Sequence, residues 1–140
     1  MRVRSNGIAA AAASMIDADF AWPDVNDTDI TRIDVFEARE IGASRILQRT
    51  RHVIDRAGYD FWVHLDVDVL DERIMPAVDS PGRPGIDPDQ IASVLGDLMA
   101  DERFVGLTLT VFDPDRDPDG QFADRIVSLF CQAETAPASA

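Results

Sequence analysis

The hydrophobic residues of this chain recur with two different spacings. Apolar side chains three or four residues apart predict amphipathic helices. Short runs in which both alternate sets of side chains are apolar predict strands that are buried on both faces. The helical spacing is clearest at residues 46–57, 88–99 and 122–133. Runs of the second kind occupy residues 61–65 and 104–112, and an alternating run at 31–36 predicts a third, shorter strand.

Turn and cap residues separate these segments. Gly58 follows the first helix where a C-terminal cap is expected. Asp87 precedes Pro88, as an N-cap precedes the first helical position. Strands and helices therefore alternate along the chain, and this alternation predicts an α/β fold with a mainly parallel sheet. Three strands make a small sheet, so we expect it to belong to a larger sheet or to self-associate.

The length of 140 residues fits one domain. We place the α/β domain at residues 31–133, after a poorly defined N-terminal segment at 1–30. Within that segment, residues 8–16 favour a short helix and residues 22–27 favour a turn. Residues 134–140 are expected to form a flexible tail.

The charge excludes several classes of partner. Twenty-six acidic residues against thirteen basic ones give a net charge of −13, and every basic residue is arginine. Such a surface repels phosphate backbones and anionic membranes, so we expect neither a nucleic acid nor a membrane as partner. No apolar run reaches the roughly 20 residues that span a bilayer. The single cysteine, Cys131, fits a reducing compartment and predicts a cytoplasmic protein.

The strongest chemical signal is the pair Asp66 and Asp68 at the carboxyl end of a buried strand. We expect both to lie on the strand two residues apart, so that their side chains share one face with Cα atoms about 6.6 Å apart. Open α/β sheets bind ligands at this edge, and two adjacent carboxylates repel unless a cation lies between them. Oxygen ligands favour Mg²⁺ or Mn²⁺. We therefore predict a divalent-metal role for this pair.

Other polar residues carry weaker signals. His64 shares that face and is a candidate partner of the metal ligands, although a neutral core histidine is the commoner role. Ser80, in the following loop, is a candidate substrate contact. The aspartates between Asp113 and Gly120 imitate an EF-hand loop but lack its final glutamate, so turn formation is the better interpretation.

The sequence from His64 to Ile86 resembles the arginase, agmatinase and formimidoylglutamase (ureohydrolase) family. The matching runs are HLDVDVLD at residues 64–71 and MPAVDSPGRPGI at 75–86. The resemblance covers residues 31–133 and corresponds to the C-terminal half of such a protein. It implies a three-layer α/β/α fold and a binuclear Mn²⁺ centre, whose bridging water attacks a guanidino or amidino carbon of a small-molecule substrate.

In this resemblance Asp66 and Asp68 match one metal-binding aspartate pair, and Ser80 matches a position near the substrate. The family's upstream histidine and its Asp-x-His-x-Asp motif have no match, because Trp62 stands where the motif's first aspartate would. Val111 occupies the position of the glutamate that binds guanidinium in arginase-type members. The catalytic residues are therefore unknown, and the expected Mn²⁺ site is incomplete.

Two alternatives remain open. A phosphatase of the haloacid-dehalogenase type also has Asp-x-Asp at a strand end, followed by a later Ser or Thr, for which Thr108 or Thr110 could serve. It also requires a basic residue, normally lysine, which this chain lacks. The other alternative is a non-catalytic half-domain that self-associates through an exposed sheet edge.

Overall fold

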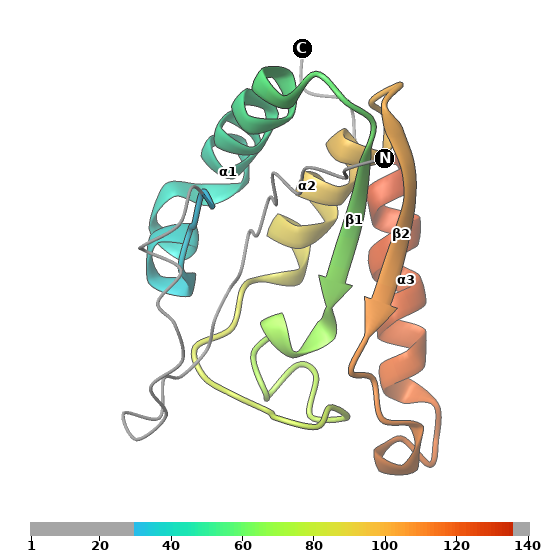
Figure 1. The fold of residues 1–140 in the computed structure, drawn as a ribbon. Coiled ribbons are helices and arrows are strands. Elements are labelled where there is room, and N and C mark those ends of the chain that lie inside the picture. Colours follow the sequence, from blue (N-terminus) through green and yellow to red (C-terminus); the bar gives the residue numbers. More distant parts are fainter. Residues whose placement is uncertain (1–29, 136–140) are drawn as a thin grey trace.

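The computed structural model describes residues 30–135. Two parallel strands, β1 (Phe61–Asp66) and β2 (Phe104–Thr110), form its sheet. Helices α2 (Pro88–Met99) and α3 (Gln121–Thr135) lie behind the strands, and α1 (Val35–Ala57) lies beside α2 (Figure 1). Two short 3₁₀ turns, η2 (Val67–Val69) and η3 (Pro114–Arg116), follow the strands. The α/β class and the parallel sheet are confirmed. Residues 30–135 supply a sheet and the helices on one side of it.

The register of the strands gives the sheet two unlike faces. Trp62 pairs with Gly106, His64 with Thr108, and Asp66 with Thr110, so their side chains share the polar face. The opposite face carries Val63, Leu65, Leu107 and Leu109, which pack into the core.

The main hydrophobic core lies between the strands, α2 and α3. The loop after β1 contributes to it as much as the helices do, because Met75, Ala77 and Val78 are completely buried. A loop with three such side chains is fixed by packing as well as by its backbone. The carboxyl edge of the sheet therefore rests on a tightly packed segment.

The strand expected at residues 31–36 is wrong. Residues 30–34 have no regular structure, and α1 begins at Val35, well before the helix expected at 46–57. The cause is Asp34, whose Oδ1 accepts a hydrogen bond of 2.9 Å from the Glu37 amide and caps the helix. Gly42, with φ 73°, kinks the helix, and this break hides its continuous pattern from the sequence.

The other cap predictions are confirmed. Asp87 caps α2 by accepting a hydrogen bond from the Asp89 amide, and Gly58 ends α1 in the left-handed region at φ 67°.

Helix α3 continues to Thr135, past the start expected for the tail at residue 134. The features expected at 8–16 and 22–27 lie outside the described residues. None of the described helices is long and apolar enough to cross a bilayer.

Candidate metal-binding edge of the sheet

Asp66 and Asp68 meet at the carboxyl end of β1, but in a different geometry from that expected. Asp66 is the last residue of the strand, whereas Asp68 lies in the turn η2, so the expectation that both lie on the strand is wrong. The Asp66 carboxylate begins the turn by accepting a hydrogen bond of 3.3 Å from the Asp68 amide. The turn therefore brings the two carboxyl groups together more directly than strand spacing would.

The electrostatics of Asp68 show that this edge concentrates negative charge. Its pKa is raised above the ordinary value of 3.8, first by burial and then by the neighbouring Asp66, to which its protonated form can donate a hydrogen bond. The charge of Asp79, in the loop after η2, raises this pKa further. Within residues 30–135 no arginine forms an ion pair with Asp66 or Asp68. Among the described residues, therefore, the two carboxylates lie close together with no arginine paired to them.

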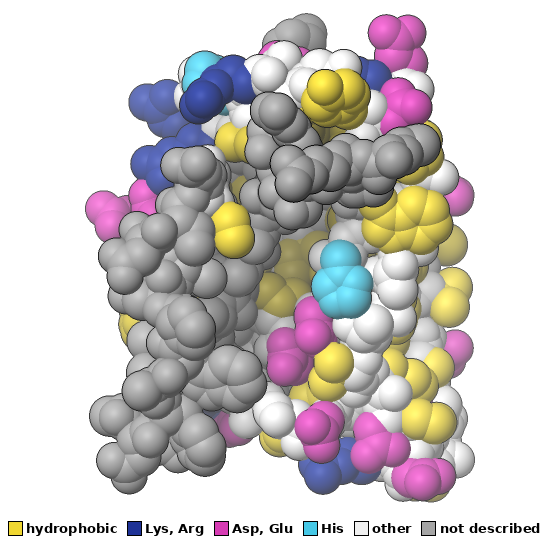
Figure 2. All heavy atoms as spheres, in the orientation of Figure 1, with side chains coloured by type: hydrophobic (Ala, Val, Ile, Leu, Met, Phe, Trp, Pro, Cys, Tyr) yellow, Lys and Arg dark blue, Asp and Glu magenta, His cyan; other side chains and the backbone are white. Residues whose placement is uncertain are grey.

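His64 is exposed on the polar face, where β2 fixes its orientation. The Thr110 hydroxyl lies 3.2 Å from His64 Nε2, within hydrogen-bond distance. Because Thr110 pairs with Asp66 in the register, this contact places the imidazole on the same face as that carboxylate. Figure 2 shows a histidine above a group of acidic side chains on this side of the molecule. The structure thus places His64 beside the carboxylates and shows no direct bond to them.

Trp62 occupies the other end of this face. Its indole Nε1 donates a hydrogen bond of 2.7 Å to the Thr108 hydroxyl, and 58% of the residue is exposed. A Cβ on Gly106 would lie 2.4 Å from the Trp62 ring, so the glycine makes room for the indole on β2. The indole and Thr108 are therefore engaged with each other, and Thr108 is not directed at the carboxylates.

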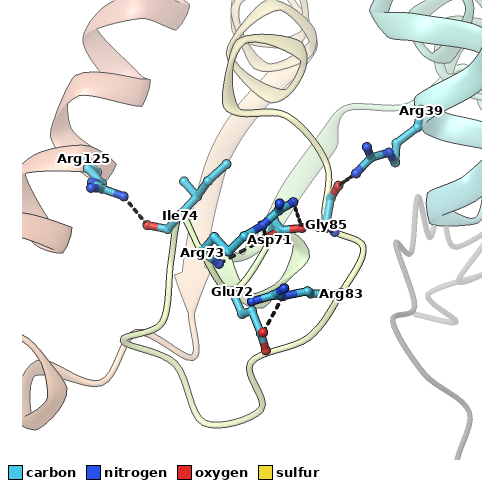
Figure 3. A network of polar contacts seen from close by, with 8 residues as sticks. All are labelled: Arg39, Asp71, Glu72, Arg73, Ile74, Arg83, Gly85 and Arg125. Carbon is cyan, nitrogen blue, oxygen red and sulfur yellow. Dashed lines mark hydrogen bonds and ion pairs between the residues drawn. The ribbon is translucent and has the colours of Figure 1, made fainter.

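The loop from residue 70 to 86 is held by its own ion pairs and hydrogen bonds (Figure 3). Asp71 is 3% exposed and makes two hydrogen bonds to the Arg73 guanidinium, of 2.6 and 2.9 Å. These bonds, with help from the Arg73 and Gly85 amides, hold the pKa of Asp71 well below its ordinary value. Gly85 lies so close that a Cβ would be 1.8 Å from the Asp71 nitrogen. Asp71 therefore closes the loop.

Three further arginines hold the same loop, two of them from neighbouring helices (Figure 3). Arg39 of α1 donates to the Gly85 carbonyl at 2.9 Å, and Arg125 of α3 donates to the Ile74 carbonyl at 2.6 Å. Arg83 pairs with Glu72 across the loop. Ser80, the expected substrate contact, is exposed within this fixed loop next to Asp79. Its role as a substrate contact therefore stays a prediction.

The acidic turn after β2 is structural, as expected. Asp113 caps η3 by accepting a hydrogen bond of 3.0 Å from the Asp115 amide. Asp117 is buried and caps α3, accepting from the Phe122 and Ala123 amides. Carboxylates engaged in this way are turn and cap residues, so the structure supports the rejection of an EF-hand here.

Sequence reasoning missed two aspartates at this edge. Asp71 and Asp79 were not singled out, because the loop folds back and brings them near the strand end only in three dimensions. The one available signal for Asp71 was Arg73 two residues later, since short Asp-x-Arg spacings allow a carboxylate to bind the guanidinium and its amide together. The charge of Asp79 could be located only once the loop had been placed.

The donors at this edge fit one hard cation better than two. Two carboxylates can hold a single Mg²⁺ or Mn²⁺ whose remaining positions are filled by water. In the described part of the chain, no group of three or more His, Cys, Asp or Glu side chains is arranged to hold a metal ion. The binuclear centre implied by the resemblance therefore does not fit residues 30–135 by themselves.

Comparison with known proteins identifies the family. The model of the arginase family matches residues 3–133, which is nearly the whole chain. The chain belongs to the arginase family. No curated protein matches this arginase-family chain significantly.

Solved structures share the fold at low sequence identity. Arginase from Bacillus caldovelox superimposes with a TM-score of 0.71 at 17% identity, covering 82% of this chain and 38% of its own. A hypothetical agmatinase from Burkholderia thailandensis gives 0.66 at 21% identity, covering 81% and 35%. Formiminoglutamase from Trypanosoma cruzi, solved with Mn²⁺, gives 0.62 at 18% identity, covering 81% and 39%. The arginase-type fold is therefore confirmed, and the chain spans less than half the length of these structures.

Proposed function

We propose that this arginase-family chain takes part in Mn²⁺-dependent hydrolysis of C–N bonds in guanidino- or amidino-type compounds. In this proposal Asp66 and Asp68 form one part of the metal site. The observation that carries it is the carboxylate pair at the end of β1, near Asp79 and without an arginine partner among the described residues. The alternative of a haloacid-dehalogenase-type phosphatase is not favoured, because the fold and the family match are those of arginases.

Each described residue has a defined part in this proposal. Asp66 and Asp68 would hold the ion through carboxylate oxygens, which suit Mn²⁺. Thr110 contacts the His64 imidazole on the same face, and Ser80, exposed in the packed loop, would contact the substrate. When bound, the metal would lower the pKa of a coordinated water and stabilise the charge that develops on the attacked carbon's substituents.

The incomplete donor set limits what these residues can do alone. Two carboxylates with one ion provide weaker binding than a full set of protein ligands, so we expect millimolar rather than micromolar affinity for Mn²⁺. Turnover would need further donors, supplied by residues outside 30–135 or by another polypeptide. We therefore expect hydrolysis by the isolated chain to be slow or absent, while metal binding itself remains measurable.

Metal binding is the direct test. We expect millimolar Mn²⁺ to raise the melting temperature by about 2–4 °C, as ligand linkage predicts for a site that is mostly occupied. The double variant Asp66→Asn with Asp68→Asn should lose this rise. The matched control is Asp115→Asn with Asp119→Asn, which removes the same charge from exposed positions and should keep it. A chain that shows no Mn²⁺-dependent rise would contradict the proposal.

Activity assays then separate the reaction classes. Guanidino and amidino compounds are incubated with the chain and Mn²⁺, and urea or ammonia release is measured. Release that disappears in the Asp66 and Asp68 double variant would support hydrolysis at this edge. Hydrolysis of an aryl phosphate that depends on Asp66 would instead favour the phosphatase alternative. Metal binding without turnover would locate the site and leave the remaining ligands to be found.

A further inference from the structure

One face of α1 carries a continuous basic stripe. Arg45, Arg49, His52 and Arg56 follow one another at helical spacings of four, three and four residues. At 100° per residue these side chains fall within about 60° of one another and extend along about 16 Å of the helix. All four are exposed. We call them the arginine stripe.

The arginine stripe is unusual for this chain. The whole sequence has twice as many acidic as basic residues, yet residues 45–56 hold four arginines, three of them in the stripe, against a single aspartate. Arg49 pairs with Glu37, whereas the Arg45 guanidinium donates to the Gln48 side chain, which carries no charge. Arginines placed four residues apart repel each other along a helix, and this arrangement lowers helix stability slightly unless an anion lies against it. The stripe therefore provides a site for an acidic surface.

The opposite end of the molecule carries the complementary charge. Residues 113–125, around η3 and the start of α3, hold five aspartates and two arginines. Asp115 and Asp119 are exposed there. Helix α1 ends just before β1 begins, whereas η3 follows the end of β2, so the two regions lie at opposite edges of the parallel sheet (Figure 1). In Figure 2 basic side chains gather at the upper left, over α1.

We propose that the arginine stripe of one molecule docks against the acidic turn around Asp115 and Asp119 of a second copy. The contact is head to tail, because a patch at one end meets a different patch at the other end. Arginine suits this role, since its planar guanidinium binds carboxylates through two parallel hydrogen bonds. Complementary patches of this kind determine orientation and association rate more than affinity, so the complex is weak and reversible.

The net charge predicts how association between two copies depends on salt concentration. Two copies with a charge of −13 each repel one another over distances comparable to the screening length, which is about 10 Å at 0.1 M salt and 30 Å at 0.01 M. At low ionic strength this long-range repulsion opposes the local attraction of the two patches. Association should therefore be strongest at about 0.1 M salt and weaker both well below and well above it.

A charge-exchange experiment tests the contact. One variant, Arg45→Glu with Arg56→Glu, makes α1 acidic, and the other, Asp115→Arg with Asp119→Arg, makes the turn basic. Sedimentation velocity on the full chain should show self-association of the original protein and at least about tenfold weaker association of each variant alone. An equimolar mixture of the two variants should associate again, since each restores the missing complement of the other.

The controls separate this contact from general charge effects. Arg32→Glu with Arg83→Glu changes the net charge by the same amount as the α1 variant, at positions outside both the stripe and the acidic turn, and should leave α1-dependent association in place. Circular dichroism checks that every variant is folded. A monomeric original protein at all salt concentrations, or a mixture of variants that fails to associate, would overturn the proposal. Association that Trp62→Ala abolishes and salt does not affect would instead assign the contact to the polar sheet face.

Discussion

Asp68 and Asp71 lie three residues apart and have opposite electrostatic environments. Burial and the nearby carboxyl groups raise the pKa of Asp68, whereas hydrogen bonds from Arg73 lower the pKa of Asp71. The difference comes from the neighbours, since burial disfavours the charged form at both positions. Asp71 has a guanidinium within hydrogen-bond distance, and Asp68 has two other carboxylates near it.

This contrast separates a structural carboxylate from a candidate ligand. The ion pair of Asp71 with Arg73 satisfies its charge inside the protein, so it can hold the loop without any bound ion. The charge at Asp66 and Asp68 has no such partner in the described part of the chain, and a divalent cation would supply one. A sequence motif rich in aspartate therefore contains both kinds, and only the position of the arginines distinguishes them.

The largest expected effect comes from disrupting the loop closure at Gly85. A Cβ at this position would lie 1.8 Å from the Asp71 nitrogen and 2.3 Å from its Cα, so Gly85→Ala forces the loop away from the backbone at Asp71. We expect the melting temperature to fall by about 10–20 °C. The control Gly58→Ala meets no atom within 4 Å but has an unfavourable φ of 67°, and should lose about 1 kcal/mol. Equal losses in the two variants would contradict the close packing of Gly85 on Asp71.

The second prediction removes the charge that closes the loop. Asp71→Asn loses the charge-assisted hydrogen bonds to Arg73, and we expect the melting temperature at pH 7 to fall by about 5–10 °C. Because the pKa of Asp71 is lowered in the folded state, its stabilisation is complete above the ordinary value of 3.8 and is lost as the pH falls below it. The variant should therefore differ most from the original protein at neutral pH and converge with it in acid.

Thermal unfolding measured between about pH 2 and pH 7 checks this dependence. Asp60→Asn, at an exposed position before β1, is the matched control and should change the melting temperature by no more than about 1–2 °C. A difference between Asp71→Asn and the original protein that stays constant down to the most acidic pH would show that the carboxylate's charge is not what holds the loop.

The sequence could predict those parts of the molecule that local patterns determine. Both described strands, the helix capped by Asp87 and the turn role of Asp117 follow from side-chain periodicity and cap chemistry. The strand expected at 31–36 failed because alternation over six residues is a weak signal beside one capping carboxylate at Asp34. Local hydrogen bonding there outweighed the pattern.

The candidate site was predictable in its residues and not in its geometry. Asp66 and Asp68 stood out because they follow a buried strand, but the turn between them depends on a side-chain hydrogen bond that spacing does not reveal. The positions of Asp71 and Asp79 depend on a loop of about fifteen residues that folds back on the core through Met75 and Val78. Such long-range packing is set by the whole tertiary structure.

The smallest expected change in melting temperature comes from removing the Asp68 charge in the absence of metal. This change is also the sharpest test of the contrast between Asp68 and Asp71. The raised pKa means that the folded state binds this proton more tightly than the unfolded state does. The ionised carboxyl therefore destabilises the fold at neutral pH, and stability rises as the pH falls through the raised value. Asp68→Asn should increase the metal-free melting temperature at pH 7 by about 1–2 °C, opposite in sign to Asp71→Asn.

Mn²⁺ should reverse which of the two proteins, the original or the Asp68→Asn variant, has the higher melting temperature. Without metal the Asp68→Asn variant melts higher, because its side chain carries no charge to repel Asp66 and Asp79. With millimolar Mn²⁺ the original protein should melt higher, since only it retains both carboxylates for the ion. Melting curves of the two proteins, with EDTA and with Mn²⁺ at pH 7, measure both orders in one experiment. A variant that melts lower in EDTA would show that Asp68, like Asp71, is a structural carboxylate, and the distinction between the two positions would fail.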